Sequence, residues 1–65
     1  MGTTYVGRTA TGEEWTIKVV KDREAYQVIV LEASRFAAFR EPNLYYAEQR
    51  VRHVICRRGY EPLGS

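Results

Sequence analysis

The segment Glu14–Lys21 alternates between polar and apolar side chains from Glu14 to Val19. Its apolar positions fall on one side of an extended chain: Trp15, Ile17 and Val19. This period of two is typical of a β-strand with one buried face and one face in water. A single strand cannot cover its own apolar side, so the rest of the chain has to supply neighbouring strands and a second layer.

Two further segments carry strand signals, one on either side of this alternating segment. Thr4–Thr9 is rich in β-branched and aromatic residues, and it runs into Gly12, which can take the positive φ of a hairpin loop. Ala25–Glu32 follows the polar turn Asp22–Glu24, and its middle is apolar on both sides, as in a central strand. Because both connections are short, the three strands are expected to form an antiparallel meander.

The segment after the third strand is open to two interpretations. Ser34 is suited to cap a short helical turn over Arg35–Arg40. Pro42 then ends this turn, because the residue before a proline is pushed out of the helical region. Alternatively, the third strand continues through Phe36. We expect the helical turn.

Residues 44–58 have the spacing of a long amphipathic helix. Their apolar members form one stripe along it: Leu44, Ala47, Val51, Val54 and Ile55. Asn43 is suited to cap the start of this helix, and Gly59 is suited to end it at positive φ. Arg57 and Arg58 in the last turn complement the helix dipole.

Together these elements predict an α+β fold in the order β-β-β-α. A three-stranded antiparallel meander is packed on one face by the C-terminal helix, as a two-layer sandwich. With 65 residues the chain has room for one domain, which we expect to span residues 1–61. Residues 62–65 are interpreted as a frayed tail or a remnant of an expression vector.

The single cysteine excludes an intrachain disulfide and a Cys-rich zinc site, and it fits a reducing compartment. The longest apolar run, Val28–Leu31, is far shorter than the roughly 18 residues of a membrane span. The first residues lack the basic and apolar regions of a signal peptide. We therefore expect a cytoplasmic protein that does not enter a membrane.

His53 and Cys56 are three residues apart on the predicted helix, so their side chains are neighbours. A Cys–His pair can activate a nucleophile. Here both residues project from the exposed side of the helix, with no obvious orienting Asp or Asn and no glycine-rich oxyanion loop. No set of three metal ligands converges either. We therefore expect a protein that is not an enzyme and that needs no cofactor and no metal.

The outer face of the predicted helix is the first candidate binding surface. It carries basic, polar and aromatic side chains: Tyr45, Tyr46, Gln49, Arg50, Arg52, His53 and Arg57. Arginine pairs with phosphate or guanine, glutamine can read adenine, and tyrosine can stack on a base. Nucleic-acid binding is therefore one hypothesis, and the low net charge of +2 weighs against it.

The second face of the sheet is the other candidate surface. A helix on one face leaves the opposite face uncovered, and Val20, Ile29 and Leu31 are predicted to lie there. Exposed apolar surface marks association, in a dimer or with a partner, unless the Phe36–Phe39 segment folds back over it. Tyr60, near the arginine-rich face, is of a type enriched at interfaces. We therefore favour a small regulatory module that acts through protein–protein association, self or partner, with nucleic-acid binding as the alternative.

Overall fold

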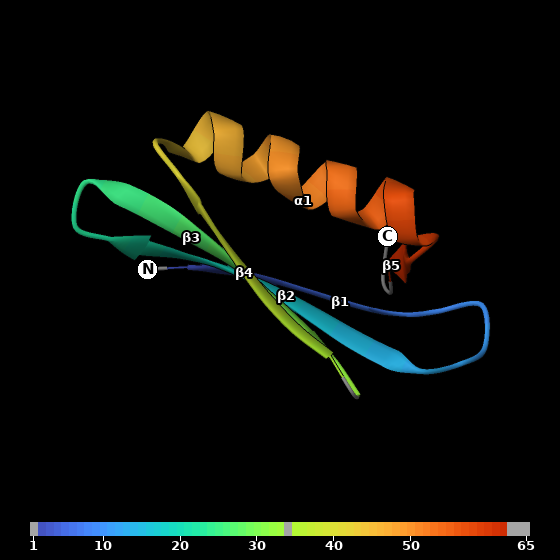
Figure 1. The fold of residues 1–65 in the computed structure, drawn as a ribbon. Coiled ribbons are helices and arrows are strands. Elements are labelled where there is room, and N and C mark those ends of the chain that lie inside the picture. Colours follow the sequence, from blue (N-terminus) through green and yellow to red (C-terminus); the bar gives the residue numbers. More distant parts are fainter. Residues whose placement is uncertain (1, 34, 63–65) are drawn as a thin grey trace.

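The helix α1 (Leu44–Arg58) lies across one face of an antiparallel β-sheet in the computed structural model, which describes residues 2–33 and 35–62 (Figure 1). The strands are β1 (Thr3–Arg8), β2 (Glu14–Asp22), β3 (Ala25–Glu32), β4 (Arg35–Glu41) and the two-residue β5 (Glu61–Pro62). Their order in the sheet is β4-β3-β2-β1-β5. The fold is therefore α+β, as the sequence predicts, with one C-terminal helix packed on one open sheet.

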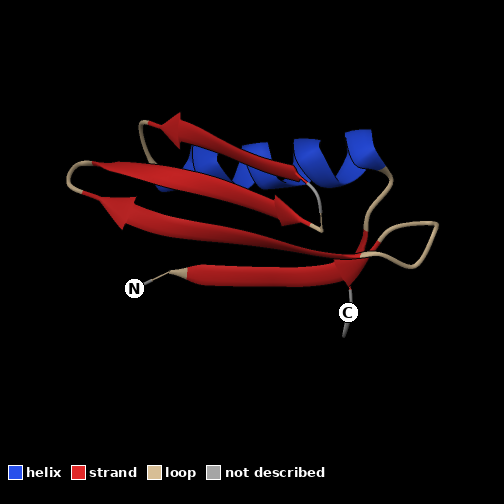
Figure 2. Ribbon diagram, turned by 60° about the horizontal axis from the view of Figure 1, so that its bottom comes forward, coloured by secondary structure: helices blue, strands red, loops and turns tan. Residues whose placement is uncertain are grey.

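The sheet has four full strands, so the prediction of three strands is wrong. The segment 35–41 forms neither a helical turn nor a continuation of the third strand, but a separate strand at the edge of the sheet (Figure 2). Its pairing with β3 runs without interruption from Arg35 opposite Glu32 to Glu41 opposite Tyr26. β4 supplies the second neighbour that the apolar middle of β3 requires, and the pairing satisfies the backbone groups on that side of β3.

Alternation along β4 sends its two phenylalanines to opposite faces of the sheet. Phe39 faces α1 and packs against the core. Phe36 lies on the far face and is 69% exposed. Because β4 lies beside β3 and not beneath the sheet, the alternative in which this segment folds back over the second face is wrong.

The core lies between the sheet and α1. The sheet contributes Trp15, Ile17 and Val19, as predicted, together with Val28 and Val30. The helix contributes Ala47, Val51 and Val54. Burial of a large apolar side chain contributes about 1.5–3 kcal/mol, so these contacts hold α1 on this face. Two residues of the predicted stripe lie at its margin, since Leu44 is 45% exposed and Ile55 is half-buried.

The ends of α1 lie where the sequence predicts them. The side-chain oxygen of Asn43 accepts a hydrogen bond from the backbone N–H of Tyr46 at 3.1 Å. Gly59 has a φ of 66°, and its N–H donates to the carbonyl of Ile55. This stop turns the chain back towards the sheet.

After α1 the chain covers one end of β1. Tyr60 stacks on Trp15 with ring centroids 4.5 Å apart and is buried, so it does not contribute to an exposed surface, although its hydroxyl lies 3.3 Å from Nη1 of Arg58 in the last turn of α1. Pro62, which the sequence pattern assigns to a tail, lies in β5 opposite Gly7. Residues 63–65 of that tail lie outside the described residues.

Candidate functional site

The outer edge of β4 presents unpaired backbone groups. Successive residues of a strand direct their N–H and C=O groups alternately to the two sides. A tight turn joins Asp22 to Ala25, so Ala25 and every second residue after it bond to β2, and the residues between them bond to β4. The partners of those residues on β4 are Arg35, Ala37, Phe39 and Glu41. The groups of Phe36, Ala38 and Arg40 therefore point outward.

No strand pairs with this outer edge within residues 2–33 and 35–62. The pairing of β4 with β3 contains no bulge, and charges occur only near the strand's ends, at Arg35, Arg40 and Glu41. Exposed edges are usually protected by lysine, proline, a bulge or a covering segment, because an open edge can pair with another chain. The centre of β4 has none of these, so it can accept a further strand.

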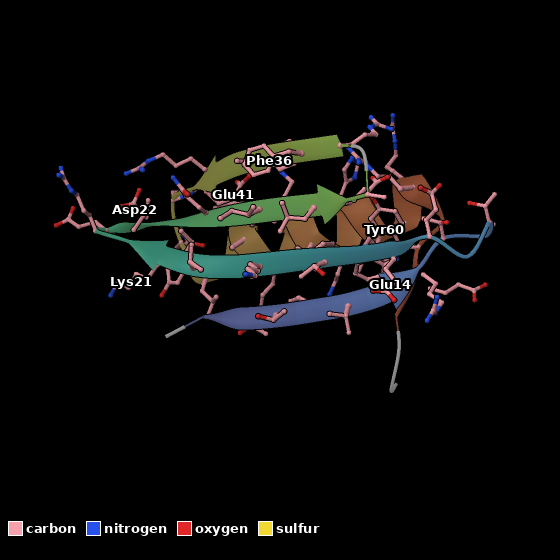
Figure 3. The ribbon with its side chains drawn as sticks, turned by 90° about the horizontal axis from the view of Figure 1, so that it is seen from below. Glu14, Lys21, Asp22, Phe36, Glu41 and Tyr60 are labelled. Atoms are coloured by element: carbon pink, nitrogen blue, oxygen red, sulfur yellow. The ribbon has the colours of Figure 1, made fainter. Side chains whose placement is uncertain are left out.

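The face of the sheet opposite α1 holds the three residues predicted to lie there, Val20, Ile29 and Leu31, all half-buried. Lys18 stands opposite Ile29 and interrupts the apolar surface. Phe36 stands opposite Leu31 and has the largest exposed fraction of the large apolar side chains described, 69% (Figure 3). The most exposed apolar group of this face therefore lies on β4, at the open edge.

A groove runs between β4 and the flank of α1, on the helix-bearing side of the sheet. Two hollows of about 310 and about 410 Å³ form it, and both are lined by Arg50 and His53. From β4 the lining residues are Arg35, Phe39 and Glu41. From α1 they are Tyr46, Gln49, Arg50, His53, Val54, Arg57 and Arg58. We call the space lined by these residues the β4 groove.

Arg50 reaches from α1 to β4 inside this groove. Its Nε donates to Glu41 Oε2 at 2.9 Å, and its guanidinium carbon lies 4.6 Å from the centre of the Phe39 ring. The Glu41 side chain is only 13% exposed, so the ion pair is partly desolvated and Arg50 is not a free cation. Arg35 and Arg57, in the larger hollow, form no ion pair with a carboxylate in the described part of the chain. Arg35 and Arg57 therefore have no described carboxylate within ion-pair distance at that end of the groove, although the charge of Arg35 helps to lower the pKa of Glu32 opposite it.

The structure divides the seven helix residues that the sequence predicts as one binding surface. Five of them line the β4 groove: Tyr46, Gln49, Arg50, His53 and Arg57. Tyr45 and Arg52 are exposed elsewhere on the helix. The wall that β4 contributes is absent from the prediction, because the pattern of residues 35–40 also fits a helical turn. No period of two marks this wall in the sequence, because residues 36–39 are all apolar.

A second cluster ties the end of α1 to β3. The Tyr60 hydroxyl and Arg58 Nη1 both donate to Glu32 Oε1. The hydrogen bond from Tyr60, with that from Arg58, holds the pKa of the Glu32 carboxyl below its ordinary value of 4.5 in spite of burial. Burial raises the pKa of the Tyr60 hydroxyl above its ordinary 10.0. These groups satisfy one another, so the role of the cluster is to hold the helix end on the sheet.

His53 and Cys56 lie in different surroundings. His53 lines the β4 groove, whereas Cys56 is an exposed free thiol outside it. Among the described residues, no group of three or more His, Cys, Asp or Glu side chains is arranged to hold a metal ion. His53 therefore shares the groove with arginine side chains, and Cys56 does not.

No described helix is long and apolar enough to cross a membrane. Comparison with models of protein families, with curated proteins and with solved structures finds no match for this chain. The function is therefore inferred from the edge of β4 and the surfaces beside it.

Proposed function

We propose that this chain is a non-enzymatic binding module that takes an extended protein segment, from a partner or another copy, as an additional strand at the outer edge of β4. The observation that carries this proposal is the outward direction of the backbone groups of Phe36, Ala38 and Arg40, on a strand with no bulge and an uncharged centre. Each backbone hydrogen bond to an added strand contributes about 0.5–1.5 kcal/mol. Several such bonds act together when a strand is added to a sheet.

The two faces of β4 give the side chains of an added strand different surroundings. On the open face of the sheet they reach Phe36, whose exposed ring offers apolar contact area. On the helix-bearing face they reach the β4 groove beside Phe39. Alternate positions of the bound segment therefore meet different surfaces, which is how strand addition obtains selectivity.

The charge of the β4 groove favours acidic side chains in the bound segment. Arg35 and Arg57 form no ion pair with a carboxylate among the residues described, whereas Arg50 is held by Glu41. A carboxylate that approaches Arg35 forms a charge-assisted hydrogen bond, which is about twice as strong as a neutral one. We expect segments with Asp or Glu on the groove-facing side to bind most tightly.

A cytoplasmic setting belongs to the same proposal. Cys56 is an exposed free thiol. A reducing compartment keeps such a thiol from forming disulfides between molecules, so that association is left to the noncovalent edge.

Selection from a displayed library of random peptides tests the proposal. We expect the wild-type chain to enrich binding peptides, and Ala38→Pro to weaken them by about tenfold or more, because proline removes the outward N–H and its ring obstructs a second strand. Phe36→Ala is expected to weaken them as well, through lost apolar contact. Arg52→Ala is the matched control, since Arg52 lies outside the groove, and it is expected to bind as the wild type does.

Two results contradict the proposal: a selection that enriches no peptide with a chain that also stays monomeric, and equal binding of enriched peptides by the wild type and Ala38→Pro. Circular dichroism of each variant shows that the fold is intact. If Ala38→Pro does not fold, Ala38→Lys replaces it, because a charged side chain at this position disfavours an apolar added strand.

Nucleic-acid binding through the basic side of α1 is the second candidate. The observation that favours it is that Arg35 of β4 and Arg57 of α1 line the same hollow of the groove, and neither forms an ion pair with a carboxylate among residues 2–33 and 35–62. If a nucleic acid binds here, affinity falls steeply with salt, and Arg35→Ala and Arg57→Ala each reduce the salt slope by about one. Binding that does not respond to salt, or no binding to DNA or RNA at low salt, removes this candidate.

A further inference from the structure

The residues of β4 complement one another when the strand is reversed about Ala38. The pairs that then meet are Arg35 with Glu41, Phe36 with Arg40, and Ala37 with Phe39. The first pair joins opposite charges, the second joins an aromatic ring to a guanidinium, and the third joins a small side chain to a large one. A strand with these properties is complementary to a second copy of itself, as a two-fold interface requires.

We propose that the strand added at the β4 edge is β4 of a second copy of this chain, antiparallel to the first, with the two-fold axis beside Ala38. The inference rests on the proposed function and names the partner of the same edge. It joins the two sheets into one continuous sheet. Both helices lie on the same side of that sheet, because a two-fold axis perpendicular to a sheet does not exchange its faces.

The directions of the backbone groups select this register. Hydrogen bonds form only in registers that place the outward residues Phe36, Ala38 and Arg40 opposite one another. With Ala38 opposite Ala38 of the second copy, all three residues take part, and about six backbone hydrogen bonds form. Sliding either strand by one repeat loses about two of these bonds. In one direction the slide also brings in Pro42, which has no N–H to donate.

On the helix-bearing side, this register places Arg35 of one copy opposite Glu41 of the other. Arg35 forms no ion pair with a described carboxylate of its own chain. The Oε2 atom of Glu41 accepts from Arg50, and a carboxylate has further lone pairs for a second guanidinium. The pair between copies therefore joins an unpaired cation to a carboxylate that is already held in place, and at 13% exposure of Glu41 water screens it weakly.

The same axis brings the start of one helix to the groove of the other copy. Arg35 and Glu41 mark the two ends of β4, and α1 begins at Leu44, soon after Glu41. The first turns of α1 in one copy therefore approach the Arg35 end of the β4 groove in the other. Tyr46, which is on the groove side of α1 and 51% exposed, is the aromatic side chain placed to meet Arg57 of the second copy. This contact enlarges an interface that strand pairing alone leaves smaller than the usual size.

Disulfide trapping tests the register at the level of single residues. In a Cys56→Ser background, Ala38→Cys is expected to form a disulfide-linked dimer on mild oxidation, because facing Cα atoms of a hydrogen-bonded antiparallel pair lie about 5.5 Å apart. Ala37→Cys is the matched control one residue away. The Cα atoms of Ala37 in the two copies lie roughly 8 Å apart in this register, beyond the reach of a disulfide. We expect trapping at least about tenfold faster for Ala38→Cys than for Ala37→Cys.

Sedimentation velocity supplies the second measurement. Between about 5 and about 500 µM, the range in which small interfaces dissociate, the wild type is expected to form dimers and Ala38→Pro to remain monomeric. Ala38→Lys places two like charges opposite each other across the axis and serves as a second variant if the proline variant does not fold.

Three outcomes overturn self-pairing: a wild-type chain that stays monomeric at the highest concentration, a dimer that both position-38 variants leave intact, and equal trapping of Ala37→Cys and Ala38→Cys. A monomeric wild type leaves the proposed function standing, because the displayed peptides test that edge separately. If peptide binding also fails, both proposals fall.

Discussion

The two edges of the sheet differ in whether another segment of the chain covers them. At the β1 edge, β5 pairs with Gly7 and Arg8, and Tyr60 just before β5 stacks on Trp15. At the β4 edge, no segment pairs with the outward groups in the described part of the chain. This holds although the centre of β4 is more apolar than β1. The chain therefore covers one end of its less apolar edge and leaves the more apolar edge open.

At the covered edge, Gly7 has no side chain at the position where β5 approaches β1. A Cβ atom at Gly7 would collide with the Trp15 ring and with the backbone carbonyl of Glu61, so only glycine fits where β5 approaches β1. β4 has no glycine, and its side chains instead complement a reversed copy of the same strand. β1 is therefore shaped for a segment of its own chain, whereas the outer edge of β4 is where we propose that another strand is added.

The largest expected effect is a difference in stability between two proline variants of β4. One replaces a residue whose N–H points towards β3, and the other a residue whose N–H points outward. Ala37→Pro is expected to lose more than about 3 kcal/mol of stability, since it removes an N–H that bonds to β3 and places a ring between the strands. Ala38→Pro, one residue on, is expected to lose less than about 1 kcal/mol, because its N–H points outward. Denaturant unfolding of the two variants at low concentration measures the difference. Equal losses of stability contradict the assignment of the Ala37 N–H to β3 and of the Ala38 N–H to the open edge.

The covered edge is tested by Gly7→Ala. The added methyl group has no space between Trp15 and Glu61, and we expect a loss of about 3 kcal/mol. Gly12→Ala is the comparison, because Gly12 has open space around it but a φ of 88°. Backbone strain alone is expected to cost about 1 kcal/mol there. Thermal unfolding of both variants checks the order, and a smaller loss at Gly7 shows that β5 does not close on β1 as described.

A smaller loss of stability is expected at Tyr60, whose hydrogen bond to Glu32 holds the end of the chain on the sheet. Tyr60→Phe removes the hydrogen bond to Glu32, and we expect a loss of about 1.5 kcal/mol at neutral pH. Because this bond lowers the pKa of Glu32 below 4.5, its contribution is present above pH 4.5 and is lost as the pH falls through the lowered pKa of the folded state. The difference in unfolding midpoint between wild type and variant is therefore expected to shrink from about pH 6 to about pH 3. A difference that stays constant over this range contradicts the role of Glu32.

α1 and β2 could be predicted from the sequence because each carries a periodic pattern, and β1 and β3 because strand-forming residues lie next to short turns. Asn43 and Gly59 also mark the ends of α1 by local backbone chemistry. β4 could not be predicted in this way. Its centre is apolar on both sides and contains Ala37 and Ala38, and alanine is the strongest helix former. Pairing with β3 decides its conformation, and that contact lies outside any local pattern.

The candidate site was predictable only in part, for a similar reason. A helical wheel places Arg52 and His53 on one outer face, but only His53 lines the groove, because the position of β4 beside α1 determines which flank takes part. The pairing of Arg50 with Glu41 likewise depends on how the chain returns from β4 into α1. Tyr60 carries no periodic signal, and its burial follows from the turn that Gly59 makes towards Trp15.

Amide hydrogen exchange along β4, measured by NMR at low and high concentration, tests the open edge most directly. In the dilute chain we predict rapid exchange at Phe36, Ala38 and Arg40, and protection at Ala37 and Phe39, whose N–H groups bond to β3. When the chain dimerises or binds a selected peptide, the three outward amides are predicted to become protected by about tenfold or more. Rapid exchange that persists at these three amides in the bound state contradicts the claim that a strand is added at β4.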